Sequence, residues 1–86
     1  MKQSVYQREY VLFLDLLRRS RAESGLTQTQ LAERLQQTQS FVSKCERGER
    51  RMDVADLYRF CRAMQVSIVD FVSDLDVVIQ SEPPDV

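Results

Sequence analysis

Apolar residues recur along this chain at the three- and four-residue intervals of amphipathic helices, and polar or turn-forming residues interrupt the pattern. The expected helices cover about residues 4–24, 27–35, 38–46, 53–64 and 67–80. The pattern therefore predicts an all-α fold, a compact domain of five helices.

Residues that cap helices mark where the two short middle helices begin. Thr27 is followed three residues later by Gln30, which is the spacing of a capping box. Thr38 stands at the expected N-cap of the next helix, and Gly48 follows its end. Helices this short are not stable alone, so the rest of the domain must hold them. Further N-cap signals are Asp53 and the pair Ser67 and Asp70.

The first helix has more apolar residues than one core-facing stripe requires. The stripe consists of Tyr6, Tyr10, Phe13, Leu14 and Leu17, and the surplus residues are Val5, Val11, Leu12 and Leu16. A helix that is apolar on more than one side is either deeply buried or packed against a second chain. An N-terminal contribution to a dimer therefore stays open.

The last apolar stripe continues two turns further than a small core needs. We expect Phe71, Leu75, Val78 and Ile79 to form a dimer interface. The β-branched run at residues 77–79 could instead pair as a short strand. We expect residues 1–80 to form one domain with this C-terminal dimerisation extension, and residues 81–86 to form a disordered tail.

The composition bears on localisation, on disulfides and on metal binding. The chain has 86 residues, no apolar run long enough for a membrane span and no export leader, so we expect a cytoplasmic protein of one domain. Cys45 and Cys61 fall at apolar helical positions, as expected for small buried hydrophobes and not for a disulfide. With no histidine and two isolated cysteines, the sequence predicts no metal site, and we expect no cofactor.

The net charge of −1 conceals a division along the chain. Residues 1–52 carry ten Lys/Arg against six Asp/Glu (+4), whereas residues 53–86 carry two against seven (−5). Such a dipolar molecule favours one orientation when it approaches a polyanion.

The third expected helix has a polar face that is rich in hydrogen-bonding groups. Gln39, Ser40, Ser43 and Lys44 project from its start and one side. The run GLTQTQLAERL followed by QQTQSFVSKCERGERR resembles the helix-turn-helix of the lambda-repressor-like, Xre- or Cro-type family of bacterial and phage DNA-binding regulators. The resemblance covers about residues 17–71 and implies that the second and third helices form the helix-turn-helix, with the third in the major groove.

The resemblance also implies roles for individual residues. Gln39, Ser40, Ser43 and Lys44 would face base edges or nearby phosphates, and Gln28 would bind phosphate and support Gln39. Phe41 would either lie against sugar or a thymine methyl group or fold back onto the core. The expected phosphate contacts are Thr27, Gln28, Arg47, Arg50 and Arg51.

Two further positions follow from the resemblance. Arg21 and Glu46 would form a structural ion pair between the first helix and the end of the third. Gln36 stands where the family usually has a glycine in a turn through positive φ. Either this turn is mildly strained or the chain takes another path there.

The resemblance implies a DNA-binding transcription regulator of bacterial or phage origin, associated with the nucleoid. We expect a repressor that binds double-stranded DNA as a homodimer on a near-palindromic operator. The alternatives are an antitoxin-type protein, whose apolar termini bind a toxin, and another protein-interaction module on the same fold. A contact with RNA polymerase also stays open. The sequence offers no nucleophile with an adjacent base, so we do not expect an enzyme.

Overall fold

The computed structural model describes the backbone of residues 5–81 and the side chains of residues 7–81, and this part of the chain contains helices and no strand. The helices are α1 (Val5–Glu23), α2 (Gln28–Leu35), α3 (Gln39–Glu46), α4 (Val54–Met64) and α5 (Ile68–Ser81). The expected all-α fold is confirmed. Within the described part, no helix is both long enough and apolar enough to cross a bilayer.

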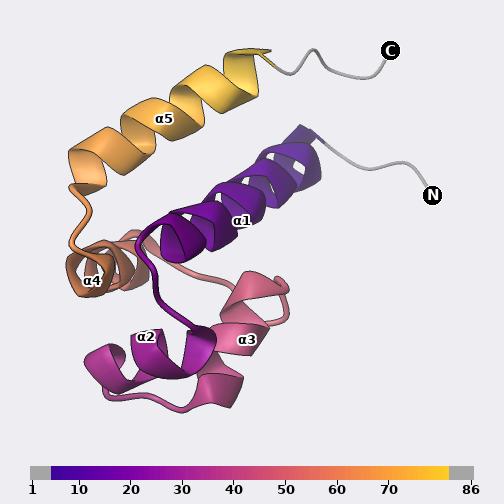
Figure 1. Cartoon of the computed structure of the whole chain (residues 1–86). Helices are drawn as coiled ribbons and strands as arrows, with labels where there is room; N and C mark the ends of the chain where they lie inside the picture. Colours follow the sequence, from indigo (N-terminus) through magenta and orange to yellow (C-terminus); the bar gives the residue numbers. More distant parts are fainter. Residues whose placement is uncertain (1–4, 82–86) are drawn as a thin grey trace.

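The helices are arranged around one core (Figure 1). α1 and α5 lie side by side and antiparallel, and α2 and α3 form a pair below them. Arg8 of α1 donates to the carbonyl of Ile79 of α5 at 3.1 Å, which joins the start of α1 to the end of α5. The α2–α3 pair is thus held at one side of a scaffold made by the other three helices.

All five helices contribute to the core. The side chains of Leu17, Leu31, Val42, Phe60 and Phe71, one from each helix, are at most 1% exposed. Phe71 packs edge-on against Phe13 of α1, with the ring centroids 5.9 Å apart. Burial of such apolar surface is the main source of stability for helices as short as α2 and α3.

The predicted caps are present at the helix starts. Thr27 Oγ1 accepts a hydrogen bond from the Gln30 backbone N–H at 3.1 Å, and the Gln30 side chain accepts from Thr27 N at 2.9 Å. Thr38 Oγ1 accepts from the backbone N–H of Phe41. The same kind of contact is made by Asp53 to the N–H of Asp56 and by Ser67 to the N–H of Asp70.

Gln36 adopts the left-handed conformation, with φ 57° and ψ 41°. The turn therefore follows the path that usually needs a glycine, at a cost of about 1–2 kcal/mol for a residue with a Cβ. Its N–H still bonds the carbonyl of Glu33, and the next N–H bonds that of Ala32. Those bonds satisfy the last carbonyls of α2 and close the turn.

The structure decides whether residues 77–79 are helix or strand, and it shows which surplus apolar residues of α1 are buried; a contribution of α1 to a dimer stays a prediction. Leu16, which lies outside the expected stripe of α1, is 7% exposed and belongs to the core, whereas Val11 is 48% exposed. Residues 77–79 are helical, so the alternative of a short strand is wrong. Ser81, the first residue of the expected tail, ends α5, and residues 82–86 lie outside the described part. The side chains of Val5 and Tyr6 also lie outside it.

Cys45 and Cys61 are buried free thiols, as predicted. Burial raises the pKa of the Cys61 thiol from 9.0 to about 11, and burial also raises the pKa of the Cys45 thiol. Both side chains therefore act as small apolar groups.

Candidate nucleic-acid interface

The two sides of α3 differ sharply in character. Val42 and Cys45 are fully buried on the inner side. The residues that the sequence predicted as the contact face lie on the other side: Gln39, Ser40 and Lys44 are exposed, and Ser43 is half-buried. Their amide, hydroxyl and ammonium groups could form hydrogen bonds with the edges of bases.

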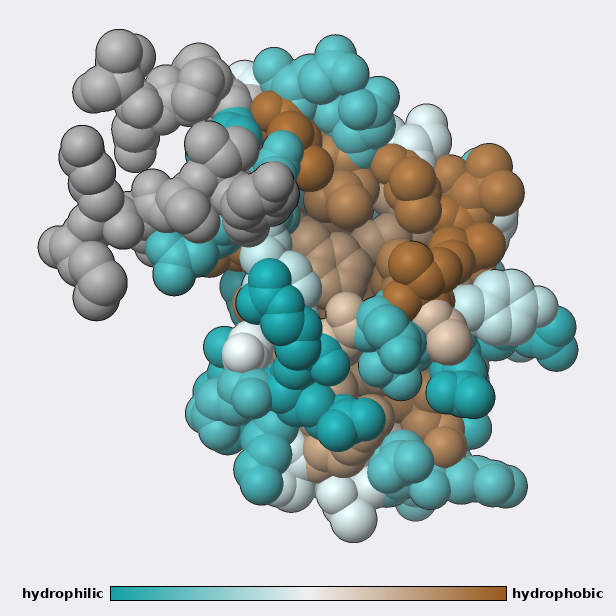
Figure 2. Space-filling model, turned by 180° about the vertical axis from the view of Figure 1, so that it is seen from behind, coloured by the Kyte–Doolittle hydropathy of each residue, from teal (hydrophilic) through white to brown (hydrophobic). Residues whose placement is uncertain are grey.

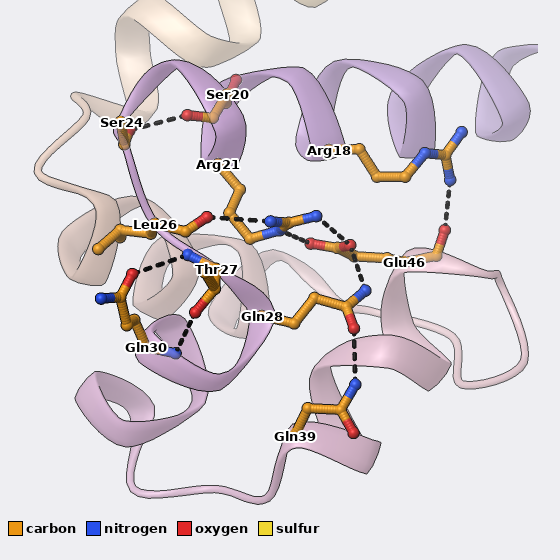
Figure 3. Close-up of polar contacts among 10 residues, drawn as sticks. All are labelled: Arg18, Ser20, Arg21, Ser24, Leu26, Thr27, Gln28, Gln30, Gln39 and Glu46. Carbon is orange, nitrogen blue, oxygen red and sulfur yellow. Dashed lines mark hydrogen bonds and ion pairs between the residues drawn. The ribbon is translucent and has the colours of Figure 1, made fainter.

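Gln39 is held by the first residue of the neighbouring helix (Figure 3). Its Nε2 donates to Gln28 Oε1 at 2.7 Å. Gln28 Nε2 in turn donates to Glu46 Oε1 at 2.9 Å. The exposed start of α3 is therefore connected, through α2, to the buried end of α3.

Glu46 is fully buried and accepts hydrogen bonds from two helices. Arg21 of α1 donates Nε to Glu46 Oε2 at 2.7 Å and a second nitrogen to Oε1 at 3.1 Å. Arg21 also bonds the carbonyl of Leu26, and Arg18 bonds the backbone carbonyl of Glu46. These contacts join the end of α1 to the end of α3 (Figure 3).

The start of α2 faces outward beside this network. The backbone N–H groups of the first turn of a helix have no partner within the helix and attract anions. One of these donors is already used, because the Gln30 N–H bonds Thr27 Oγ1. Thr27 is exposed and Gln28 half-buried at this helix end, which places both where an anion could approach.

Arg47 is already engaged within the protein. It forms an ion pair with Glu49, with Nε and Oε2 2.7 Å apart, and it donates a hydrogen bond to Ser43 Oγ. The hydrogen bond and charge of Arg47 lower the pKa of the Glu49 carboxyl, and the same contact raises the pKa of Arg47. Both side chains are exposed, so solvent screens the pair and a phosphate could replace Glu49.

Arg50 and Arg51 belong to the loop after α3, and each places its guanidinium over an aromatic ring. The guanidinium carbon of Arg50 is 4.9 Å from the centre of the Phe41 ring, and that of Arg51 is 4.3 Å from the Tyr10 ring. A guanidinium over a ring can still direct in-plane N–H donors to another acceptor, although Arg50 also interacts with the Cys45 thiol. Phe41 itself packs against Phe60, with centroids 6.3 Å apart, so packing accounts for its position.

Tyr10 and Arg18 have roles at this surface that the sequence analysis did not assign. The hydroxyl of Tyr10 accepts a hydrogen bond from the Met52 backbone N–H at 3.1 Å. This bond holds the loop that contains Arg50 and Arg51 against α1. Arg18 binds the last carbonyl of α3, where positive charge also suits the helix dipole. Their spacing in the sequence signals only a core tyrosine and a basic helix end.

The expected dimer residues lie on α5, and two of them line a hollow whose edge also includes Arg51 and Met52 of the loop after α3. Leu75 and Ile79 of α5 line an open hollow of about 540 Å³ between α1, α4 and α5, together with Tyr10, Phe13, Leu57 and Val72. Figure 2 shows apolar side chains gathered in the upper half of the face it presents, above a largely hydrophilic lower half. Val78 is half-buried on another face of α5, where it lines a separate hollow with Leu16 and Val77, whereas Phe71 is 1% exposed and has almost no surface left for a partner.

Comparisons with known proteins agree on one family. Residues 12–71 match the sequence family described as "Helix-turn-helix domain". The chain is 40% identical over 58 residues to y4dJ of Sinorhizobium fredii (strain NBRC 101917 / NGR234), an uncharacterised HTH-type transcriptional regulator; this match covers 67% of the chain and 75% of that protein.

Two solved structures extend the similarity to three dimensions. An XRE-family-like protein from Pseudomonas syringae pv. tomato str. DC3000 is 41% identical with a TM-score of 0.81, over 85% of this chain and 89% of that one. A mutant of the restriction-modification controller protein C.Esp1396I is 26% identical with a TM-score of 0.76, over 83% of this chain and 97% of that one.

Proposed function

Because the chain belongs to the Xre-type helix-turn-helix family of DNA-binding transcription regulators, we propose that it is a sequence-specific repressor that acts as a homodimer on a near-palindromic operator. In this fold α2 and α3 are the helix-turn-helix, and α3 enters the major groove. Occupancy of the operator would exclude RNA polymerase from a nearby promoter. A direct contact with the polymerase is a further route to the same regulation.

The observation that carries this proposal is the contact between Gln39 and Gln28 at the exposed start of α3. A side chain held in this way is ordered before it meets DNA, so less conformational entropy is lost on binding. We assign base and groove contacts to Gln39, Ser40, Ser43 and Lys44. Phe41 then supports Arg50 at the edge of the groove.

Phosphate contacts surround these side chains on our assignment. Thr27 and Gln28 stand at the start of α2, and Arg47, Arg50 and Arg51 follow α3. Contacts of this kind supply affinity and position without reading sequence. Arg47 would exchange Glu49 for phosphate, whereas Arg50 and Arg51 are already held by aromatic rings.

The homodimer is the second part of the proposal. Exposed and half-buried apolar residues of α5 border the hollow between α1, α4 and α5, and a second copy would cover them. The α3 helices of the two copies, related by a two-fold axis, would contact half-sites about 34 Å apart, which is one turn of the duplex. We accordingly divide the chain into a DNA-binding domain over residues 1–80, whose C-terminal part dimerises, and a short tail.

The same hollow supports an alternative. A different protein could fill it, as in an antitoxin-type regulator that binds a toxin and represses its own operon, or in another interaction module. Its lining is mainly apolar, which suits a protein partner of either kind.

Selection of bound duplexes from a random DNA pool tests the proposal. The expected result is an enriched near-palindrome whose half-site centres are about one helical turn apart. Titration of that duplex and of random DNA at two salt concentrations should then give a specific affinity and a salt slope. A folded protein that enriches no duplex would contradict the DNA-binding function and direct the search to a protein partner.

A further inference from the structure

A chain of three side chains runs from the buried end of α3 to its exposed start (Figure 3). Glu46 Oε1 accepts a hydrogen bond from Gln28 Nε2 at 2.9 Å. Gln28 Oε1 accepts from Gln39 Nε2 at 2.7 Å. Arg21 completes the buried end by donating to both carboxylate oxygens of Glu46.

The carboxylate determines the direction of every hydrogen bond in this chain. An ionised carboxylate has acceptors and no donor, so Gln28 must turn its NH₂ group toward Glu46. The carbonyl oxygen of Gln28 then points the other way, toward Gln39. Gln39 must therefore donate, and its own carbonyl oxygen remains free.

The free groups of Gln39 match one purine and not the other. They are Oε1, which accepts, and the second N–H of Nε2, which donates. Adenine presents a donor at N6 and an acceptor at N7 in the major groove, whereas guanine presents two acceptors at O6 and N7. Adenine thus completes two hydrogen bonds with Gln39, and guanine sets one of its acceptors against Oε1.

We propose that Glu46, acting through Gln28, holds the amide of Gln39 in the orientation that accepts adenine and rejects guanine. Glu46 is in this sense a positioning residue for base recognition, in addition to its ion pair with Arg21. The inference rests on the proposed DNA-binding function and adds to it the positioning role of Glu46 in the choice of base.

The experiment measures dissociation constants on the selected operator and on a copy that differs at one base pair. Gln39→Ala first identifies that pair, because the variant loses its preference there. With G·C in place of A·T at this pair, the wild-type protein should bind about 5-fold to 150-fold more weakly, the range for one good bidentate contact. This ratio of dissociation constants is the readout.

Glu46→Gln should bring the ratio toward one while Gln28 and Gln39 stay unchanged. An amide at position 46 offers a donor as well as an acceptor, so Gln28 and Gln39 could then take either orientation. Adding Gln28→Glu to this variant returns a carboxylate to the chain one step nearer Gln39, which must again donate, and the ratio should recover. Gln37→Met, at an exposed glutamine of the turn between α2 and α3, is the control and should leave the ratio unchanged.

The outcomes separate this inference from the proposed function. A wild-type preference for guanine at the Gln39 pair, or a folded Glu46→Gln variant with the wild-type ratio, would overturn the inference and leave the DNA-binding function standing. If Glu46→Gln does not fold, Gln28→Met decides, because it breaks the chain and leaves the Arg21–Glu46 pair in place; an unchanged ratio would again overturn the inference. A wild-type protein that enriches no duplex contradicts both.

Discussion

Arg21 and Glu46, which are 25 residues apart in the sequence, meet through two hydrogen bonds of 2.7 and 3.1 Å. The Arg21 side chain is 18% exposed and the Glu46 side chain 1%. Arg21 thus stands between the buried carboxylate and solvent. The pair joins α1 to α3 at the point where α3 ends.

Arg21→Ala should lower the free energy of unfolding by about 3–5 kcal/mol, because it leaves the carboxylate of Glu46 buried without its cation. Urea denaturation followed by circular dichroism measures the change. Arg19→Ala is the matched control: Arg19 pairs with Asp15 at 3.3 Å on the surface of the same helix, with both side chains about half exposed. It should cost less than about 1 kcal/mol. Equal losses would mean that the Arg21 pair contributes no more than a surface pair.

Gly48→Ala should destabilise the protein more than Gly25→Ala does. Both glycines have positive φ, 81° and 77°, so each substitution carries about 1–2 kcal/mol of backbone strain. A Cβ at position 48 would also lie 3.0 Å from Leu14 Cδ1, whereas a Cβ at position 25 would have no atom within 4 Å. Thermal melting of both variants measures the difference, and a Gly25 variant that melts at or below the temperature of the Gly48 variant would contradict this reasoning.

Arg50→Ala should weaken binding to all duplexes alike. Loss of one phosphate contact should also reduce the slope of log K against log salt concentration by about one unit. Fluorescence anisotropy at several salt concentrations gives that slope. Arg59→Ala removes an exposed arginine of α4 that pairs with Asp56, and it should leave the slope as it is. An unchanged slope in Arg50→Ala would remove this residue from the proposed phosphate contacts.

Leu75→Asp should convert a dimer into a folded monomer, because it sets a charge in the apolar hollow of α5. Sedimentation velocity reports the assembly state, and circular dichroism checks that the helices remain. Val69→Asp places the same charge on α5 at a residue that is 73% exposed and does not line the hollow. The control should stay dimeric; a dimeric Leu75→Asp would locate the interface elsewhere.

The stability of the protein should fall as the pH rises from 9.0 through about 11, in part because of Cys61. Its pKa is raised to about 11 by burial, so the folded state keeps the thiol protonated while the unfolded chain ionises above 9.0. The contribution is complete below pH 9.0 and is lost as the pH approaches the folded pKa. Cys61→Ala should remove this part of the pH dependence, as seen in urea denaturation at about pH 8 and about pH 10.5. Parallel pH profiles for the two proteins would show that the thiol does not contribute.

The helix starts were predictable from sequence because their causes are local. Thr27 with Gln30, Thr38 and Asp53 each satisfy backbone N–H groups within four residues, so a short window contains the whole interaction. The apolar stripes of α4 and α5 follow the helical period for the same reason. Leu16 was assigned to the surplus because only one apolar stripe was assumed for α1, whereas this helix packs on two sides.

The long-range contacts of the candidate site were not accessible in the same way. The pairing of Arg21 with Glu46 followed from family resemblance, since nothing local relates the two residues. The stacking of Arg50 on Phe41 and the bond from Arg18 to the carbonyl of Glu46 depend on how α1, α3 and the following loop meet in space. The sequence at Gln36 was compatible with two conformations of the turn between α2 and α3, and only the dihedral angles of this residue distinguish them.

The contacts of Arg18 and Arg21 with Glu46 have a mechanical consequence. Arg18 bonds the backbone and Arg21 the side chain of the last residue of α3, so two residues about one turn apart on α1 hold the same end of α3. Such a double attachment resists rotation as well as separation, so α1 and α3 should move together as one rigid unit. α5 lies against α1. In a dimer formed along α5, the angle between the two copies would therefore determine the relative orientation of their α3 helices. A change of packing at α5 would then alter the distance between the α3 helices of the two copies, and so the spacing of the half-sites that they could contact.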